Sequence, residues 1–265
     1  MDEQIQQPRP QGDHPLGDTP APEQPQEVAT PEPVRTTRWI DSWWFFWSFA
    51  LCATLFWAAE VWYYYSRIPN DLTGALVNGS ALAGMTLISC ALFSSAIFKW
   101  IPRYAQYWRL RRFMGFAGVA MIIIHIGSFL YLVLGLNLWI LFTEWNPLKN
   151  PLLFGLFAFI IFLVMFSTST DWAMQKIGPK RWKNIHRFVY IAYPAAIFHY
   201  LLLRPDVKSN PAGILLLAVT ALAVFGQLFW FFKIASRQKF RTKGAAIGFT
   251  IIALVIIIGY LAWGR

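Results

Sequence analysis

The chain has 265 residues, of which 57% are hydrophobic, 18% aromatic and only 14% charged. Soluble domains carry about 25% charged residues, so this composition excludes an ordinary soluble enzyme. The net charge of +10 does not indicate nucleic-acid binding, because the basic residues cluster in alternate loops between apolar segments. That pattern reports membrane topology. We therefore expect membrane lipid, and no nucleic acid, among the partners.

The first 36 residues are rich in Pro, Gln and Glu and hold eight of the sixteen prolines. Such a segment cannot bury enough apolar surface to order itself. It also lacks the apolar stretch of a secretory signal peptide. We predict that residues 1–36 form a disordered cytoplasmic tail.

Seven apolar segments follow the tail. Only helices satisfy their own backbone polar groups in lipid, and about 20 apolar residues suffice to span a bilayer. The fold class expected is therefore all-α, a polytopic membrane helix bundle in which Cys52 and Cys90 are small buried residues. The predicted helices cover residues 43–65, 80–100, 113–137, 151–170, 186–203, 212–234 and 246–263.

Basic residues are distributed unequally between the two sides of these segments. Counting from Arg35, 17 lysines and arginines fall on the side of the N-terminus and 5 on the opposite side. Lys and Arg accumulate in cytoplasmic loops. The chain is thus expected to have a cytoplasmic N-terminus, a C-terminus outside the cytoplasm and odd-numbered helices that run outward.

Two histidines lie inside apolar segments that run in the same direction, His125 in 113–137 and His199 in 186–203. At 1.5 Å per residue both are roughly 18–20 Å from the inner edge. Two imidazoles at one depth can supply both axial ligands of a b-type haem. Gly118, two turns before His125 on the same face, leaves room for a flat cofactor. The alternative is a helix–helix seam in which the histidines only form hydrogen bonds.

His186 lies at the inner edge of its segment, level with Arg111 and Arg112 rather than with another histidine. These residues cannot build a second bis-histidine haem. His186 is therefore a candidate for contact with a haem propionate, a quinone or a flavin, for ligation of a second haem with another group, or for an interfacial role beside a basic loop. Arg112 is either a propionate partner or an ordinary positive-inside residue, because a guanidinium only donates.

Two stretches carry a family resemblance. They are FSTSTDWAMQKIGPKRWKNIHRFVYIAYPAAIFHYL, residues 166–201, and RRFMGFAGVAMIIIHIGSFLY, residues 111–131. The chain resembles the ferric-reductase-like transmembrane domain family over residues 43–234. Within that family it is most similar to the haem-binding membrane subunits of the bacterial periplasmic methionine-sulfoxide reductase system. The tail 1–36 and the helix at 246–263 depart from the family pattern.

The resemblance implies a six-helix haem core over residues 43–234, and the helix predicted over 246–263 is additional to this core. It implies one haem b on His125 and His199, or two haems, with His186 and Arg112 as further cofactor-binding positions and FMN or quinone as further cofactors. The chain would be a non-catalytic subunit of the bacterial inner membrane. It would relay electrons from quinol or a cytoplasmic flavin reductase to a periplasmic, molybdenum-dependent methionine-sulfoxide reductase.

Two other functions fit the same residues. A ferric or cupric reductase component would use the same haem with a metal as electron acceptor. A transporter would use the histidines as proton relays, although Glu60 is the main acidic residue available within the membrane. Absence of a haem absorbance band after haem supplementation would favour the transporter.

Overall fold

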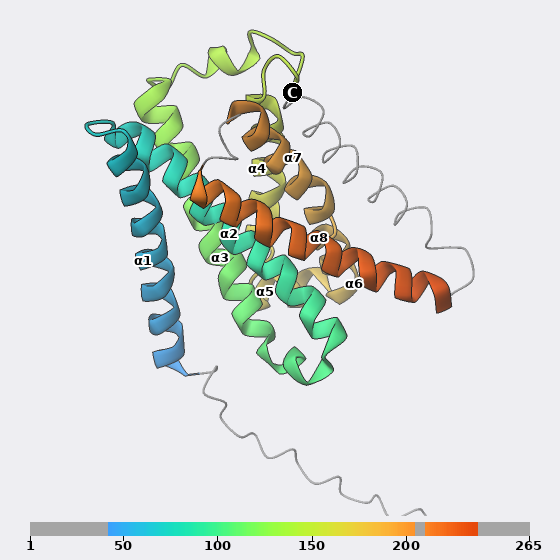
Figure 1. Ribbon diagram of the computed structural model, residues 1–265. Helices are drawn as coiled ribbons and strands as arrows, with labels where there is room; N and C mark the ends of the chain where they lie inside the picture. Colours follow the sequence, from blue (N-terminus) through green and yellow to red (C-terminus); the bar gives the residue numbers. More distant parts are fainter. Residues whose placement is uncertain (1–41, 205–209, 238–265) are drawn as a thin grey trace, which may run out of the picture. The chain divides into compact units, whose positions relative to one another are not determined.

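The computed structural model describes residues 42–204 and 210–237, and every regular element in these ranges is helical (Figure 1). Six helices have 15 or more residues, and short helical segments connect some of them. The elements are α1 (Trp43–Arg67), α2 (Leu72–Trp100), η2 (Pro102–Tyr107), α3 (Trp108–Ser128), η3 (Phe129–Val133), η4 (Leu138–Phe142), α4 (Leu152–Ser167), α5 (Asp171–Ile177), α6 (Pro179–His186), α7 (Val189–Leu203) and α8 (Pro211–Arg237).

The predicted all-α class with several membrane-spanning helices is confirmed. Among the described residues, four stretches are long and apolar enough to cross a membrane, and the bent pair α4–α5 makes a fifth if it counts as one span. With 15 residues, α7 is shorter than the about 20 residues of a full span. The predicted count of six plus one helices is therefore not established. The predicted tail 1–36 and helix 246–263 lie outside the described residues.

The second helix begins at Leu72, eight residues before its predicted start at 80. Asp71 caps it by accepting a 2.7 Å hydrogen bond from the Gly74 amide. The segment was missed because Asn78, Gly79 and Ser80 lower its apolar content. The first of these polar groups is satisfied within the helix, since the Asn78 amide donates to the Gly74 carbonyl at 2.7 Å.

Two short helices connect the predicted helices 151–170 and 186–203. Thr170 caps α5 through a 3.1 Å hydrogen bond from Ala173, and the chain bends by 91° between α4 and α5. Gly178, at φ +85°, ends α5, and Pro179 occupies the first turn of α6, since glycine tolerates positive φ and proline favours a helix start. A turn at residues 187–188 then separates α6 from α7. His186 therefore belongs to the short helix α6 and not, as predicted, to the helix of His199.

The α2 helix packs against α1, α3 and α8, whereas α4 packs against α7 (Figure 1). Glycines permit the closest approaches. A Cβ at Gly84 would lie 2.8 Å from the Gly118 carbonyl oxygen, and one at Gly79 would lie 2.7 Å from the backbone of Val61. Small residues allow backbones to approach in this way in membrane bundles. The prediction that both cysteines are buried is wrong for Cys52, which is exposed on α1, while Cys90 is half-buried.

Candidate functional site

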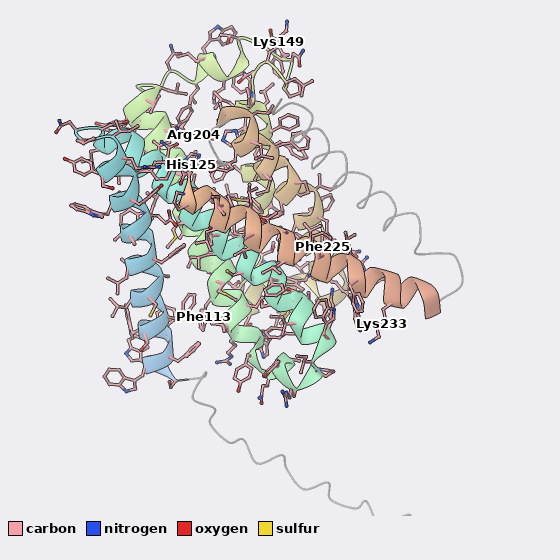
Figure 2. The ribbon with its side chains drawn as sticks, viewed as in Figure 1. Phe113, His125, Lys149, Arg204, Phe225 and Lys233 are labelled. Atoms are coloured by element: carbon pink, nitrogen blue, oxygen red, sulfur yellow. The ribbon has the colours of Figure 1, made fainter. Side chains whose placement is uncertain are left out.

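The imidazoles of His125 and His199 face each other across the bundle. His125 lies on α3 and His199 on α7, and their ring centroids are 6.5 Å apart with an interplanar angle of 66°. Figure 2 shows His125 toward the end of the bundle that carries Arg204 and Lys149. The depth shared by the two histidines, predicted from helix rise alone, is thus observed.

Both rings are held by the same kind of hydrogen bond. The Nδ1 atom of His125 lies 2.7 Å from the Val77 carbonyl oxygen, and that of His199 lies 3.0 Å from the Pro151 carbonyl oxygen. A carbonyl oxygen only accepts, so each Nδ1 carries the proton. In a neutral imidazole the other nitrogen, Nε2, then keeps its lone pair. This is the form in which histidine binds a metal ion.

Gly155 on α4 makes room for the second ring. A Cβ at this position would lie 2.9 Å from both Cε1 and Nδ1 of His199, closer than normal contact allows. The glycine is four residues after Pro151, whose carbonyl accepts the hydrogen bond from the same ring. One turn of α4 therefore both orients His199 and leaves space for it.

Gly118 lies against α2 and not against a histidine ring. A Cβ there would be 2.7 Å from Cγ1 of Ile88 and 2.8 Å from the carbonyl oxygen of Gly84. The residue is buried between α2 and α3. This placement gives Gly118 a role in helix packing, and its contribution to cofactor binding stays a prediction.

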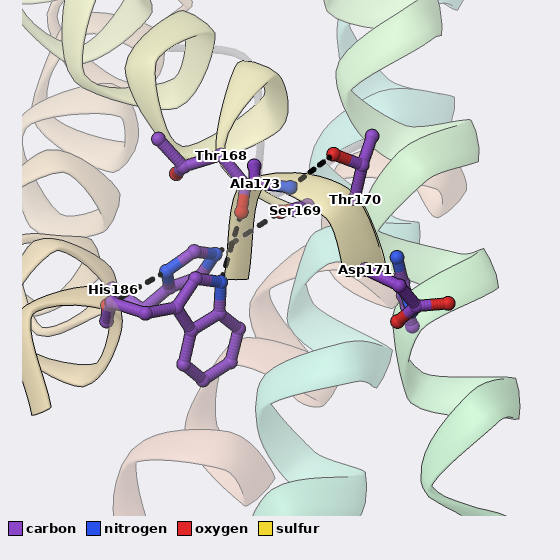
Figure 3. A network of polar contacts seen from close by, with 8 residues as sticks. Thr168, Ser169, Thr170, Asp171, Ala173 and His186 are labelled. Atoms are coloured by element: carbon purple, nitrogen blue, oxygen red, sulfur yellow. Dashed lines mark hydrogen bonds and ion pairs between the residues drawn. The ribbon is translucent and has the colours of Figure 1, made fainter. Parts of the chain in front are cut away.

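His186 lies in a separate polar cluster at the opposite end of α4 (Figure 3). Its ring stacks on Trp182 with centroids 4.0 Å apart. The Nδ1 atom donates to the Trp182 carbonyl oxygen at 3.1 Å, and Nε2 is 3.0 Å from the Ser169 hydroxyl. The Trp182 indole donates to the Thr168 carbonyl oxygen at 2.9 Å. Both nitrogens of His186 are thus engaged within the chain, whereas His125 and His199 each form one such hydrogen bond with the part of the chain that the structure describes.

Burial lowers the pKa of His186, and repulsion from Arg111 and Arg112 lowers it further, while the hydrogen bond to the Trp182 carbonyl acts in the opposite direction. The ring is therefore neutral at neutral pH. The Ser169 hydroxyl donates its one proton to the Met165 carbonyl oxygen at 2.5 Å, so its contact with Nε2 does not by itself select the neutral ring.

Arg112 joins the cluster of His186 and not the pair of His125 and His199. It forms a 2.6 Å ion pair with Asp171 at the start of α5, and its guanidinium lies over the rings of Trp108 and Phe116. Thirteen residues of helix, about 20 Å, separate it from His125. The structure thus brings two predicted site residues together and places His186 and Arg112 elsewhere. Roles for the latter two in cofactor binding stay predictions.

Comparison with known proteins identifies relatives of the chain. The family described as ferric reductase like transmembrane component matches residues 80–197. A protein-methionine-sulfoxide reductase heme-binding subunit MsrQ from Klebsiella pneumoniae is 30% identical over 175 residues, which cover 64% of this chain and 82% of the relative. The chain belongs to the MsrQ family of ferric-reductase-like membrane proteins.

Other MsrQ proteins are similar to a comparable degree. The one from Enterobacter sp. is 28% identical over 185 residues, covering 68% of this chain and 84% of the relative. The one from Brucella ovis is 28% identical over 141 residues, covering 52% and 61%. No solved structure matches the chain. The family match includes His125 and His186 and ends two residues before His199.

Sequence reasoning missed the groups that orient the histidines in this MsrQ-family chain. Backbone carbonyls, such as those of Val77 and Pro151, leave no signal in the residue type. Gly155 did leave one, because an isolated glycine in an apolar helix indicates close approach of another group. Ser169 and Trp182 lie inside the stretch that carries the resemblance, yet only the fold shows that they enclose His186.

Proposed function

We propose that this MsrQ-family chain binds haem b through His125 and His199 and serves as the membrane electron-transfer subunit of a methionine-sulfoxide reductase system. The observation that carries the proposal is the facing pair of imidazoles, each with its Nδ1 proton directed to a backbone carbonyl. The printed names of the relatives, which describe haem-binding subunits of such a reductase, support it.

The spacing of the two rings fits one iron between them. A metal–imidazole nitrogen bond is about 2.0–2.1 Å, and the ring centre lies about 1.1 Å beyond the nitrogen, so two opposed ligands have centroids about 6.3 Å apart. The observed distance is 6.5 Å. Within residues 42–204 and 210–237 no group of three or more His, Cys, Asp or Glu residues could hold a metal ion. Two protein ligands suffice for haem because the macrocycle supplies the others.

A bound haem would supply one-electron transfer, and the protein tunes it through its axial ligands and their hydrogen bonds. The residues of the chain position the two imidazoles. The carbonyls of Val77 and Pro151 fix the tautomer and rotation of each imidazole. Gly155 admits the ring of His199. Apolar helices around the pair exclude water, which strengthens these hydrogen bonds.

The acceptor that we propose is a periplasmic, molybdenum-dependent methionine-sulfoxide reductase. His125 lies toward the end of the bundle that carries Arg204 and Lys149 (Figure 2), and the distribution of basic residues predicts that this end faces the periplasm of a bacterial inner membrane. The donor that we propose is quinol or a cytoplasmic flavin reductase acting at the opposite end. The basic charges of that end would attract an acidic protein face or an anionic flavin such as FMN.

Replacing each histidine by alanine tests the ligand assignment. His125→Ala and His199→Ala should each abolish low-spin haem absorbance in the purified protein, because each removes an axial nitrogen. His186→Ala should keep most of it, since both nitrogens of His186 already bond within the chain. Loss of the haem in His186→Ala, with the haem retained in His125→Ala, would refute the pairing.

The same protein tests the electron donor. NAD(P)H alone should leave the haem oxidised, whereas a flavin reductase system or a quinol analogue should reduce it. Electron delivery to metal chelates, but not to a periplasmic reductase, would favour a ferric or cupric reductase instead. Absence of haem after supplementation would favour a proton-conducting transporter, for which Glu60 is the candidate because it is buried in α1 with one oxygen lacking a partner in the described chain.

A further inference from the structure

One end of the bundle, which we call the basic end, gathers cations from α2, α3 and α6. Lys99 is repelled by Arg111 and Lys183, and His186 by Arg111 and Arg112. Arg112 is neutralised by Asp171. Within residues 42–204 and 210–237, no carboxylate forms an ion pair with Lys99, Arg111 or Lys183. These three charges therefore face one another without a negative partner from the described chain.

A buried amide holds Lys99 in position. The Lys99 ammonium donates to Oε1 of Gln227 on α8 at 2.9 Å, and Nε2 of Gln227 donates to the Leu92 carbonyl oxygen at 3.0 Å. Gln227 is only 5% exposed. The amide thus has both ends occupied and fixes the ammonium between α2 and α8. An ammonium has three N–H donors, and this arrangement uses one of them.

Arg111 approaches the same turn of α2 from α3. It donates a long, 3.3 Å hydrogen bond to the Ser95 hydroxyl, and Ser95 is one helical turn before Lys99. Tyr190 on α7 interacts electrostatically with Arg111 and with Arg187. The guanidinium is half-buried and has five N–H donors, of which one forms a hydrogen bond with the part of the chain that the structure describes. Two cations with spare donors therefore converge on one site.

Like charges that are partly removed from water are costly unless an anion neutralises them. A guanidinium fork binds phosphate in a bidentate manner, and a lysine beside it adds a point charge. Trp100, next to Lys99 in the chain, and Trp108, three residues before Arg111, are 41% and 43% exposed, as expected for side chains at the headgroup level of a membrane. We propose that Lys99 and Arg111, with Lys183 at the rim, bind the phosphate group of an anionic phospholipid.

Two probes applied to the full-length purified protein distinguish a lipid phosphate from that of a soluble nucleotide. The first is native mass spectrometry after reconstitution in mixed phosphatidylglycerol and phosphatidylcholine, with retained lipid counted per chain. The second is titration with FMN, followed by flavin fluorescence and competed by inorganic phosphate. The variants are Arg111→Gln, Arg111→Lys and Lys183→Gln. The control is Arg103→Gln, which removes an exposed arginine from the same end outside the site.

Arg111→Gln should weaken the retention of phosphatidylglycerol about tenfold, as expected for loss of a charge-assisted hydrogen bond. Arg111→Lys should keep most of the binding, and Lys183→Gln should weaken it without disturbing the fold because the side chain is exposed. An Arg111-dependent loss of phosphatidylglycerol supports the proposal. Equal loss in Arg103→Gln, absence of retained phosphatidylglycerol, or an Arg111-dependent loss of FMN binding alone would overturn it. Haem absorbance should not change in any variant, so the outcome is independent of the histidine pair.

Discussion

At the scale of single residues, Gly155 offers a direct test of how the histidine pair is positioned. Its missing Cβ leaves space that a methyl group would take only 2.9 Å from two ring atoms of His199. We expect Gly155→Ala to rotate the ring, weaken its hydrogen bond to the Pro151 carbonyl and lower haem content or alter the low-spin spectrum. The measurement is the haem-to-protein ratio with the absorbance spectrum.

Gly127→Ala is the matched control for this substitution. Gly127 lies on α3 two residues after His125, and a Cβ there would have no neighbour within 4 Å. Both changes replace a helical glycine by alanine near one of the two histidines, but only Gly155→Ala encounters a ring. If the two variants lose haem equally, steric contact with His199 is not the cause.

His186 predicts a dependence of stability on pH. Its pKa in the folded chain is lowered, first by burial and then by Arg111 and Arg112, whereas the unfolded value is about 6.5. The unfolded chain therefore binds the proton more tightly, so this contribution is present above about pH 6.5 and decreases as the pH falls toward the folded pKa. We expect the thermal midpoint of the wild type to drop between neutral and mildly acidic pH.

His186→Gln should flatten this pH dependence, because glutamine has no proton to gain and can still form hydrogen bonds at the same place. Tryptophan fluorescence is a suitable signal, since Trp182 stacks on the ring. Equal slopes of the midpoint against pH in the two proteins would show that another group titrates in this range.

At the scale of helices, the contact between α2 and α3 depends on two opposed glycines. Gly118→Ala would place a methyl group 2.8 Å from the backbone oxygen of Gly84 and 2.7 Å from Ile88, and backbone cannot move aside as a flexible side chain can. We expect a loss of about 1–3 kcal/mol, typical of overpacking, seen as a lower thermal midpoint. Gly115→Ala on the same helix has no neighbour within 4 Å and should gain about 0.5–1 kcal/mol.

The Gly118→Ala variant also distinguishes a role of Gly118 in helix packing from a role in cofactor binding. If Gly118→Ala loses haem without any loss of stability in the haem-free protein, then the glycine borders the cofactor, as its position two turns before His125 suggested. A parallel loss of stability with and without haem would assign it to the α2–α3 contact alone.

The helices themselves could be predicted because apolar length and the absence of backbone partners in lipid leave no other structure. The depth of His125 and His199 followed from the rise per residue. Breaks were harder to predict, because the turn at Arg187 and Phe188 that separates α6 from α7 contains no glycine or proline to mark it. Polar residues such as Asn78 hid the first turns of α2. Carbonyl partners such as those of Val77 and Pro151 depend on tertiary packing and have no sequence signal.

At the scale of the whole molecule, the two ends of the bundle carry different charge. The 17 basic residues on the side of the N-terminus, against 5 on the other, include those of the basic end around Lys99 and Arg111. Lys and Arg are retained in the cytoplasm during membrane insertion. The basic end is therefore expected to face the cytoplasm, and the end that carries Arg204 and Lys149 is expected to face the periplasm.

Reporter fusions at two positions test this orientation and the predicted seventh helix together. The last described helix, α8, ends at Arg237, and the apolar segment 246–263 follows it. Alkaline phosphatase, which folds only outside the cytoplasm because it needs disulfides, should be inactive when fused after Arg237 and active when fused after Arg265. The activity should differ between the two positions because the 18 apolar residues of segment 246–263 are long enough to cross the membrane once more. Activity at both positions would show that α8 ends outside the cytoplasm and that residues 246–263 do not cross the membrane. Inactivity at both positions would show that α8 ends in the cytoplasm, as expected, but that residues 246–263 do not cross the membrane.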